Sequence, residues 1–326
     1  MNTELDALVD RADLDDIIRR IDGLCESRDW ETLAALRDKC AAAVKTGRQT
    51  WPCATLANYR LALLATPALA AATLEHPTST FSIGPLTEVI SQHHTWADLE
   101  AHLEPGPARG FVAYERALRG DNVPADPSLT AVLEIPVNPA PWEPPYATPT
   151  YSDHDVSAPS PLLDLPSMTT VRCRRAQVDS DPDIEAAVRG VVEAWTTQSN
   201  GRLSFAAVSG GIDSALGALG LAEARVAPLE PSQVLSIVAW AGASGGAHGR
   251  RRGTAQGRFS AWWFATAMAD ALDEWPLPPG TLRAEMEELQ WFVWKTEEPD
   301  QGWQLQLVIE DPFNDMSWAF SARDMS

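Results

Sequence analysis

The sequence predicts an all-helical N-terminal half and an α+β C-terminal half joined by a proline-rich linker. Up to about residue 123, apolar residues recur at helical spacing in short segments bounded by glycine or proline. Between 124 and 167, prolines recur every few residues. From 168 onward, several segments alternate apolar and polar residues, as strands do. We therefore expect a helical domain at 1–123, a linker at 124–167 and an α+β domain with a mixed sheet at 168–326.

Seven short helices are expected in the N-terminal domain. Asp13 is placed to cap the first and Asp29 the second, because a carboxylate accepts the free N–H groups at a helix start. The pattern Thr-Trp-Ala-Asp at 95–98 resembles a capping box with Asp in place of Glu. A series of short antiparallel helices indicates a stack of the HEAT or tetratricopeptide kind, although no fixed repeat period is present.

The linker is expected to be extended, because its prolines rule out helices and central strands. It carries three aromatic residues, Trp142, Tyr146 and Tyr151, through which it either lies along one domain or docks into an aromatic groove of another protein. No P-x-x-P motif with flanking basic residues accompanies them.

The C-terminal domain is expected to follow the order β-α-β-α-β-α-α-β-β-β, which indicates an α+β fold with a mixed sheet that ends in an antiparallel meander. Asp181-Pro182 is typical of a helix start. The predicted strands are Thr169–Val178, Leu203–Val208, Arg225–Leu229, Leu289–Lys295, Trp303–Glu310 and Met316–Ala322, and the predicted helices run to Trp195, over Ala215–Leu221, and over about 231–242 and 254–273.

Composition narrows the classes of function. A net charge of −20 repels phosphate backbones and anionic lipid, so nucleic acid and membranes are unfavourable partners, and a basic partner or a small ligand fits better. The 4 cysteines form no C-x-x-C pair, which argues against a zinc or redox site. The N-terminus carries acids where a secretory signal needs a basic start. We expect a cytoplasmic protein with a protein partner and no resident cofactor or metal.

One motif lies between a predicted strand and a predicted helix: Ser209, Gly210, Gly211, Ile212, Asp213 and Ser214. Two glycines let the backbone approach an anion, and free N–H groups at a helix start point at it. The motif resembles the S-G-G-x-D-S loop of the PP-loop ATP pyrophosphatases. That resemblance implies a parallel sheet, an ATP phosphate site at Ser209, Gly210, Gly211, Asp213 and Ser214, and assistance by Mg²⁺. The alternative is a structural turn in which the glycines supply the bend.

A second candidate site is the Gly/Arg segment, residues 242–258. It gathers five cationic or titratable side chains among its glycines: His248, Arg250, Arg251, Arg252 and Arg258. Arginine binds phosphate or carboxylate bidentately, so the segment indicates an anion pocket or a surface for an acidic partner. The alternative is a loop whose arginines balance nearby acids.

The Gly/Arg segment, followed by Trp262-Trp263 and the ending Ile309-Glu310-Asp311-Pro312, also resembles uncharacterised proteins of high-GC actinobacteria. This resemblance implies no activity.

Because no catalytic constellation stands out, the sequence predicts a non-catalytic binding or interaction protein with the Gly/Arg segment as its anion or partner site. The alternative, from a different class, is an ATP-dependent adenylating enzyme that uses Ser209–Ser214 as its pyrophosphate loop.

Overall fold

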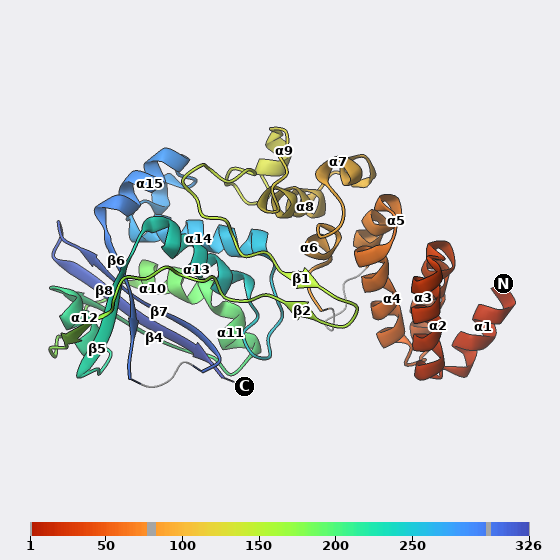
Figure 1. Cartoon of the computed structure of the whole chain (residues 1–326), viewed down its shortest axis with the longest axis horizontal. Coiled ribbons are helices and arrows are strands. Elements are labelled where there is room, and N and C mark those ends of the chain that lie inside the picture. Colours follow the sequence, from red (N-terminus) through yellow and green to blue (C-terminus); the bar gives the residue numbers. More distant parts are fainter. Residues whose placement is uncertain (1, 77–82, 298–300, 326) are drawn as a thin grey trace. The chain divides into compact units, whose positions relative to one another are not determined.

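The computed structural model describes residues 2–76, 83–297 and 301–325 (Figure 1). The chain divides into two units, a helical unit of Met1–Val132 with Pro149–Ser157 and an α/β unit of Leu133–Thr148 with Ala158–Ser326. The predicted fold class, a helical domain followed by an α+β domain, is confirmed. The predicted linker, 124–167, is shared between the two units, so the chain passes from one to the other three times.

Helices dominate the first unit. None of the described helices is long and apolar enough to cross a membrane. Its elements are α1 (Asn2–Arg11), α2 (Leu14–Ser27), α3 (Trp30–Lys45), α4 (Trp51–Leu64), α5 (Pro67–Ala72), η1 (Thr73–Glu75), α6 (Leu86–Ile90), α7 (Trp96–Leu99), η2 (Glu100–His102), α8 (Pro107–Leu118), α9 (Pro127–Thr130), β1 (Thr150–Tyr151) and β2 (Val156–Ser157).

The predicted caps of these helices are present. The Asp13 side chain accepts from two backbone N–H groups at the start of α2, and the Asp29 side chain caps α3. Thr95 and Asp98 form the predicted capping box of α7. Helix α1 was not predicted, although Leu5 and Val9 bury themselves in the same core as α2, α3 and α4.

The prediction that prolines rule out helices between 124 and 167 is wrong at one helix, whereas the two-stranded hairpin β1–β2 does not contradict the exclusion of central strands. Helix α9 begins at Pro127, where proline is tolerated because the first helical N–H needs no partner, and the Asp126 side chain caps it. The hairpin β1–β2 lies in the helical unit, where Tyr151 is buried. Gln92 fixes Tyr151 by donating to its carbonyl (3.0 Å) and accepting from its N–H (2.6 Å).

The α/β unit contains one sheet of order β3-β5-β6-β7-β8-β4. All of its described strand pairs are antiparallel, whereas a mixed sheet was expected. Helices α11 and α15 were not expected as separate elements. The elements are β3 (Thr169–Arg172), α10 (Pro182–Val191), α11 (Glu193–Gln198), β4 (Arg202–Ser209), α12 (Ile212–Ala218), β5 (Glu223–Leu229), α13 (Pro231–Ala243), α14 (Thr254–Met268), η3 (Leu272–Glu274), α15 (Pro279–Glu288), β6 (Gln290–Lys295), β7 (Trp303–Asp311) and β8 (Met316–Asp324).

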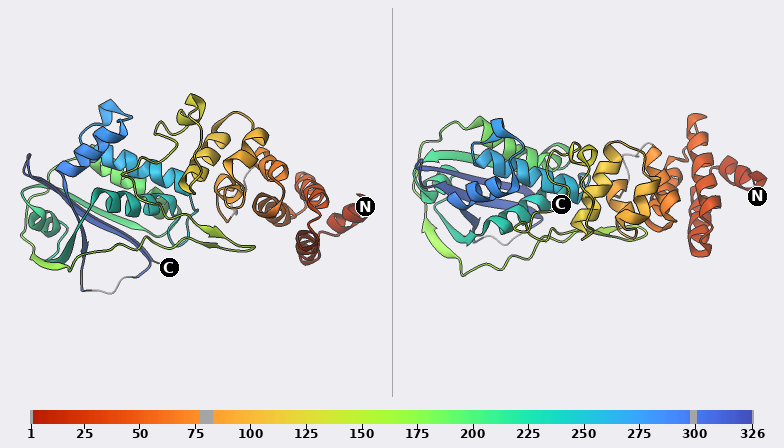
Figure 2. Two further views of the ribbon diagram at one scale, coloured as in Figure 1. Left: turned by 45° about the horizontal axis from the view of Figure 1, so that its top comes forward. Right: turned by 90° about the horizontal axis from the view of Figure 1, so that it is seen from above.

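The two faces of this sheet are covered by different helices (Figures 1 and 2). One face packs against the layer of α10, α13 and α14, where the ring of Phe264 meets Trp291 and Phe320. The other face packs against the short helix α12, through a cluster that includes Val208, Val308 and Trp294. Because side chains alternate along each strand, every central strand contributes to both cores.

A buried ion pair joins the segment 133–148 to α14. The side chains of Glu143 and Arg258 are both 0% exposed, and Arg258 donates from Nε (2.7 Å) and Nη2 (2.8 Å) to the two carboxylate oxygens. Glu143 also accepts from the Tyr146 hydroxyl (2.7 Å), the Trp262 indole (3.1 Å) and the Ala140 N–H (2.7 Å).

The third guanidinium nitrogen of Arg258, Nη1, donates to the carbonyl of Pro136 (2.6 Å), so Arg258 contacts both the backbone and a side chain of this segment. Burial alone would raise the pKa of Glu143, but the hydrogen bonds and charge of Arg258 hold it below its usual range. The carboxylate is therefore charged in the folded protein, and the network of donors around it offsets its desolvation.

We expect Arg258→Ala to lower the free energy of unfolding of the full chain by about 3–5 kcal/mol, because it leaves a buried carboxylate without a cation. Urea denaturation followed by tryptophan fluorescence would measure this. The matched control is Glu143→Leu/Arg258→Met, which removes both charges and keeps apolar volume, and it is expected to lose less. If the double variant lost as much free energy of unfolding as Arg258→Ala, the loss would come from packing rather than from the unpaired charge.

A dependence on pH follows from the lowered pKa of Glu143. The stabilisation by this carboxylate is complete above its unfolded pKa, about 4.3, and is lost as the pH falls through the lower folded value. We expect the free energy of unfolding to fall more steeply in acid for the natural protein than for Glu143→Leu/Arg258→Met. Denaturation curves across acidic pH test this, and equal slopes would contradict it.

Candidate functional site

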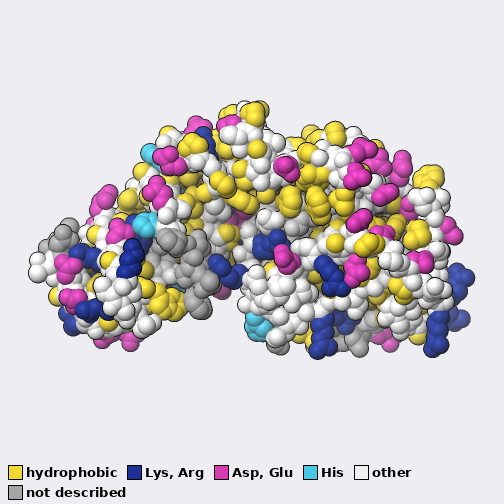
Figure 3. Space-filling view, turned by 180° about the vertical axis from the view of Figure 1, so that it is seen from behind, with side chains coloured by type: hydrophobic (Ala, Val, Ile, Leu, Met, Phe, Trp, Pro, Cys, Tyr) yellow, Lys and Arg dark blue, Asp and Glu magenta, His cyan; other side chains and the backbone are white. Residues whose placement is uncertain are grey.

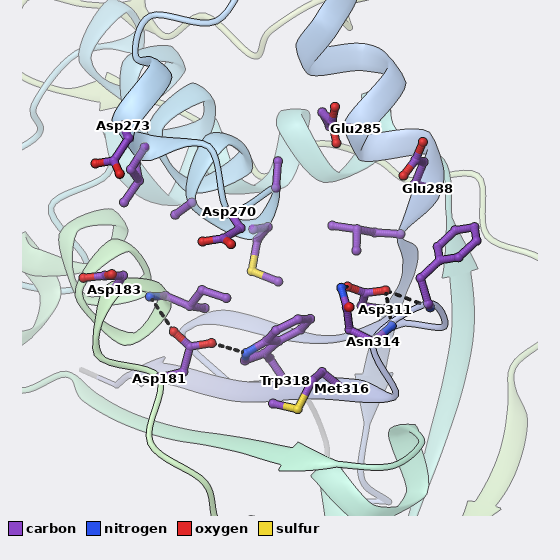
Figure 4. A pocket seen from close by; sticks show the side chains of 17 residues that line it. Asp181, Asp183, Asp270, Asp273, Glu285, Glu288, Asp311, Asn314, Met316 and Trp318 are labelled. Atoms are coloured by element: carbon purple, nitrogen blue, oxygen red, sulfur yellow. Dashed lines mark hydrogen bonds between the residues drawn. The ribbon is translucent and has the colours of Figure 1, made fainter.

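A cavity of about 550 Å³ opens at one end of the α/β unit, on the sheet face that α10 and α14 cover (Figure 4). Four parts of the fold line it: the start of α10, the end of α14 with the turn that follows, the end of α15, and the hairpin between β7 and β8. The cavity size is within the range of small-ligand sites, about 300–1,000 Å³.

Carboxylates dominate the lining of this cavity, which we call the acidic cavity. In the part of the chain that the structure describes, the lining contains no Lys, Arg or His, and no basic side chain lies within ion-pair distance of its carboxylates. Figure 4 shows that they come from all four elements. They are Asp181, Asp183, Asp270, Asp273, Glu285, Glu288 and Asp311.

Helix ends add to the negative potential. Both α14 and α15 point their C-terminal ends at the cavity, and neither has a basic residue in its last turn. A helix C-terminus carries a partial negative charge, and a basic side chain in the last turn would offset it. Asp270 follows α14 in the left-handed region (φ 50°), a conformation that Asp adopts more readily than most residues. The local sequence therefore concentrates negative charge where basic side chains would be expected.

The sheet contributes the apolar side chains of Met316 and Trp318 to the wall of the acidic cavity. Trp318 is 6% exposed, and its indole N–H donates to Asp181 Oδ2 (2.8 Å), while Asp181 Oδ1 accepts from the Ile184 N–H at the start of α10 (3.3 Å). Asp311 accepts from the N–H groups of Phe313 (2.9 Å) and Asn314 (3.1 Å), which fixes the hairpin turn. Phe313 itself is 79% exposed, so an aromatic ring borders the opening.

This arrangement can bind a cation that also carries apolar surface. The carboxylates attract and orient a guanidinium or ammonium group, while Trp318, Met316 and Met268 offer contact to its aliphatic part. Among the described residues, no group of three or more His, Cys, Asp or Glu is arranged to hold a metal ion.

The residues of the Gly/Arg segment contact different partners. Arg258 is the buried partner of Glu143 described above. The guanidinium of Arg252 donates to the Gly190 carbonyl (3.1 Å) and lies 3.7 Å from Glu193.

The other three residues of the segment lie around its loop. Arg251 donates to the Thr254 hydroxyl (3.1 Å). His248 and Arg250 are exposed, and their backbone N–H groups bond to Ser199 and Gln198. Binding of an anion or a partner by this segment stays a prediction. The residues concerned are His248, Arg250, Arg251, Arg252 and Arg258.

The loop Ser209–Ser214 does connect a strand to a helix. Gly210 has φ 112°, and its N–H donates to the Asp315 carbonyl (2.7 Å). The neighbouring side chains are mostly acidic, however. Ser209 donates to Asp179 (3.0 Å), and burial, followed by the charges of Asp213 and Asp315, raises the pKa of Glu310.

The strand before this loop, β4, is the last strand in the sheet order and pairs antiparallel with β8. On its other side Ala207 forms an isolated antiparallel bridge with Asp179. The PP-loop resemblance implied a parallel sheet instead. Asp213 forms an ion pair with Arg174, so one basic side chain lies beside the loop. ATP binding by Ser209, Gly210, Gly211, Asp213 and Ser214 stays a prediction.

Sequence reasoning did not identify the acidic cavity, because its carboxylates lie in four segments between Asp181 and Asp311 that only the tertiary fold brings together. One local signal was present: the segment Ala284–Leu289 carries three glutamates in the last turns of a helix, and the last turn itself contains no basic residue.

Comparison with known proteins shows what the chain is similar to. The model of a family of unknown function, DUF6183, matches residues 15–325. No curated protein and no solved structure matches the chain significantly.

We expect Asp181→Ala to lower the free energy of unfolding by about 2–4 kcal/mol, because it removes the cap of α10 and leaves the buried Trp318 indole N–H unpaired. Asp183→Ala is the matched control: Asp183 is exposed in the first turn of the same helix, and its loss should cost less than about 1 kcal/mol. Chemical denaturation compares the two, and equal losses would contradict the role of the Asp181–Trp318 bond.

Proposed function

We propose that this chain, which belongs to the DUF6183 family of unknown function, is a non-catalytic binding protein whose acidic cavity takes a basic segment of a protein partner. The observation that supports the proposal is the set of seven carboxylates around one cavity with an apolar wall and with no basic side chain at ion-pair distance in the described chain. Carboxylates that no internal cation neutralises are available to an external cation.

Two features favour a peptide segment over a single small cation. The carboxylates are spread around the opening rather than focused on one point, so they match several positive charges at separate positions (Figure 4). The exposed ring of Phe313 extends the surface beyond the cavity, where it can contact an arginine face. On the face shown in Figure 3, acidic side chains also gather over the end of the α/β unit that carries α15.

For the cellular location and the source organism of the protein, we keep the expectations drawn from the sequence. A cytoplasmic, actinobacterial protein with a net charge of −20 meets basic partners through long-range attraction, which accelerates association and is weakened by salt.

The direct test uses a fluorescent hexa-arginine peptide and fluorescence anisotropy at low ionic strength. The triple variant Asp270→Asn/Glu285→Gln/Glu288→Gln is expected to bind it about tenfold more weakly, since each exposed charge pair contributes about 0.2–1 kcal/mol. The matched control Asp164→Asn/Glu223→Gln/Glu297→Gln removes three exposed acids of the same unit outside the cavity and should change binding by less than about twofold. Equal weakening in both variants would show attraction by net charge alone and would refute a defined site.

The alternative enzyme hypothesis, an ATP-dependent adenylating enzyme built on Ser209–Ser214, has its own test. Because acidic groups surround this loop, we expect Mg·ATP to leave the Tm unchanged. A ligand at 100 times its Kd stabilises by about 2.7 kcal/mol, which raises the Tm by a few degrees. A rise in the natural protein that Asp213→Ala abolishes would overturn this expectation and favour the enzyme.

A further inference from the structure

A second cavity, of about 540 Å³, lies on the opposite face of the same sheet, beside the end of α12. None of the described residues that line it is Asp or Glu, although the chain contains 45 acidic and 25 basic residues. Its polar side is formed by β4 and β8 and its apolar side by Trp294 and by Leu219 and Leu221, which follow α12.

Two arginines face each other across neighbouring strands in this cavity. Arg202 of β4 is paired in register with Arg323 of β8, and both line the cavity. Like charges directly opposite one another destabilise a strand pair. No carboxylate of the described chain lies within ion-pair distance of Arg202, which is exposed. An anion seated between the two guanidinium groups would be attracted by both of them.

Neighbouring groups position the site. When the Gln306 amide is assigned from its neighbours, its oxygen accepts from Nη2 (2.8 Å) and Nε (3.2 Å) of Arg323 and its nitrogen donates to the Trp294 carbonyl (3.2 Å), so the next strand orients Arg323. Two residues along the same strand pair, on the same face, lie Ser204 and Ser321, which also line the cavity. Two cations and two hydroxyl donors on one side, with an apolar wall on the other, match an anion that carries apolar substituents.

We propose that this cavity binds a small organic oxyanion, a carboxylate or a phosphate ester, with its charged group between Arg202 and Arg323. Its apolar part lies against Leu219, Leu221 and the edge of Trp294. The site is independent of the acidic cavity, because the two lie on opposite faces of the sheet and share no lining residue.

The structural alternative is that the arginines protect the sheet edge. β4 is an edge strand, and charged side chains on edge strands prevent pairing with other chains. That role predicts no dependence on an added anion, so binding measurements separate the two.

Isothermal titration calorimetry of the full chain at low ionic strength, with phenyl phosphate, benzoate and inorganic phosphate as separate probes, tests the proposal. We expect phenyl phosphate or benzoate to bind, and Arg202→Gln and Arg323→Gln each to weaken that binding about tenfold. Arg172→Gln is the matched control: Arg172 is an exposed arginine on β3, at the other edge of the same sheet, and its loss should leave the affinity unchanged.

A further variant covers the case in which an arginine substitution disturbs folding. Ser204→Asp places a carboxylate beside both arginines, so it should abolish anion binding while the Tm stays the same or rises. Binding of phenyl phosphate alone would identify the oxyanion as a phosphate, and binding of benzoate alone would identify a carboxylate. Binding of inorganic phosphate alone, no binding of any probe, or equal loss in Arg172→Gln, would overturn the proposal.

Discussion

The α/β unit depends on one buried charge pair. Arg258 and Glu143 are both inaccessible to water, and removing either would leave the other as an isolated charge in the interior. The pair therefore fixes the position of two elements at once: the segment 133–148, whose backbone carbonyls also accept from Arg258, and helix α14, which carries the arginine. Because the far end of α14 borders the acidic cavity, the same contact that holds the segment also holds one wall of the candidate site.

The two cavities show how a strongly acidic chain can still present surfaces of both signs. On the helix-covered face of the sheet, four elements end together and no base accompanies their carboxylates. On the α12 face, two arginines of adjacent strands line a cavity that contains no described acid. The sheet separates the negative electrostatic potential of the acidic cavity from the positive potential beside the two arginines. Successive side chains along each strand point to opposite faces of the sheet. Net charge alone describes neither surface.

Local signals in the sequence predicted most of the elements, because a cap or a period needs only neighbouring residues. The start of α10 at Asp181-Pro182 is one such case. Helix α15 was missed because Pro279 and Gly280 are typical of a loop, although proline also favours the first helical position. The Glu143–Arg258 pair joins residues 115 positions apart, and no local rule indicates which acid neutralises which base over that separation. The same limit applies to both cavities, whose walls come from segments distant in the chain.

The alternation of the chain between its two units constrains how the protein can form during synthesis. The helical unit needs the hairpin Pro149–Ser157, and the segment just before that hairpin belongs to the other unit. After the first 132 residues have left the ribosome, the helical unit is still incomplete. The segment 133–148 then lacks its packing partner until α14 is synthesised, more than a hundred residues later. Its apolar residues, Ile135 and Val137 among them, have no core during that interval. Neither unit can therefore finish folding before later residues are synthesised. We expect a nascent chain stalled between the two units to expose apolar residues to chaperones.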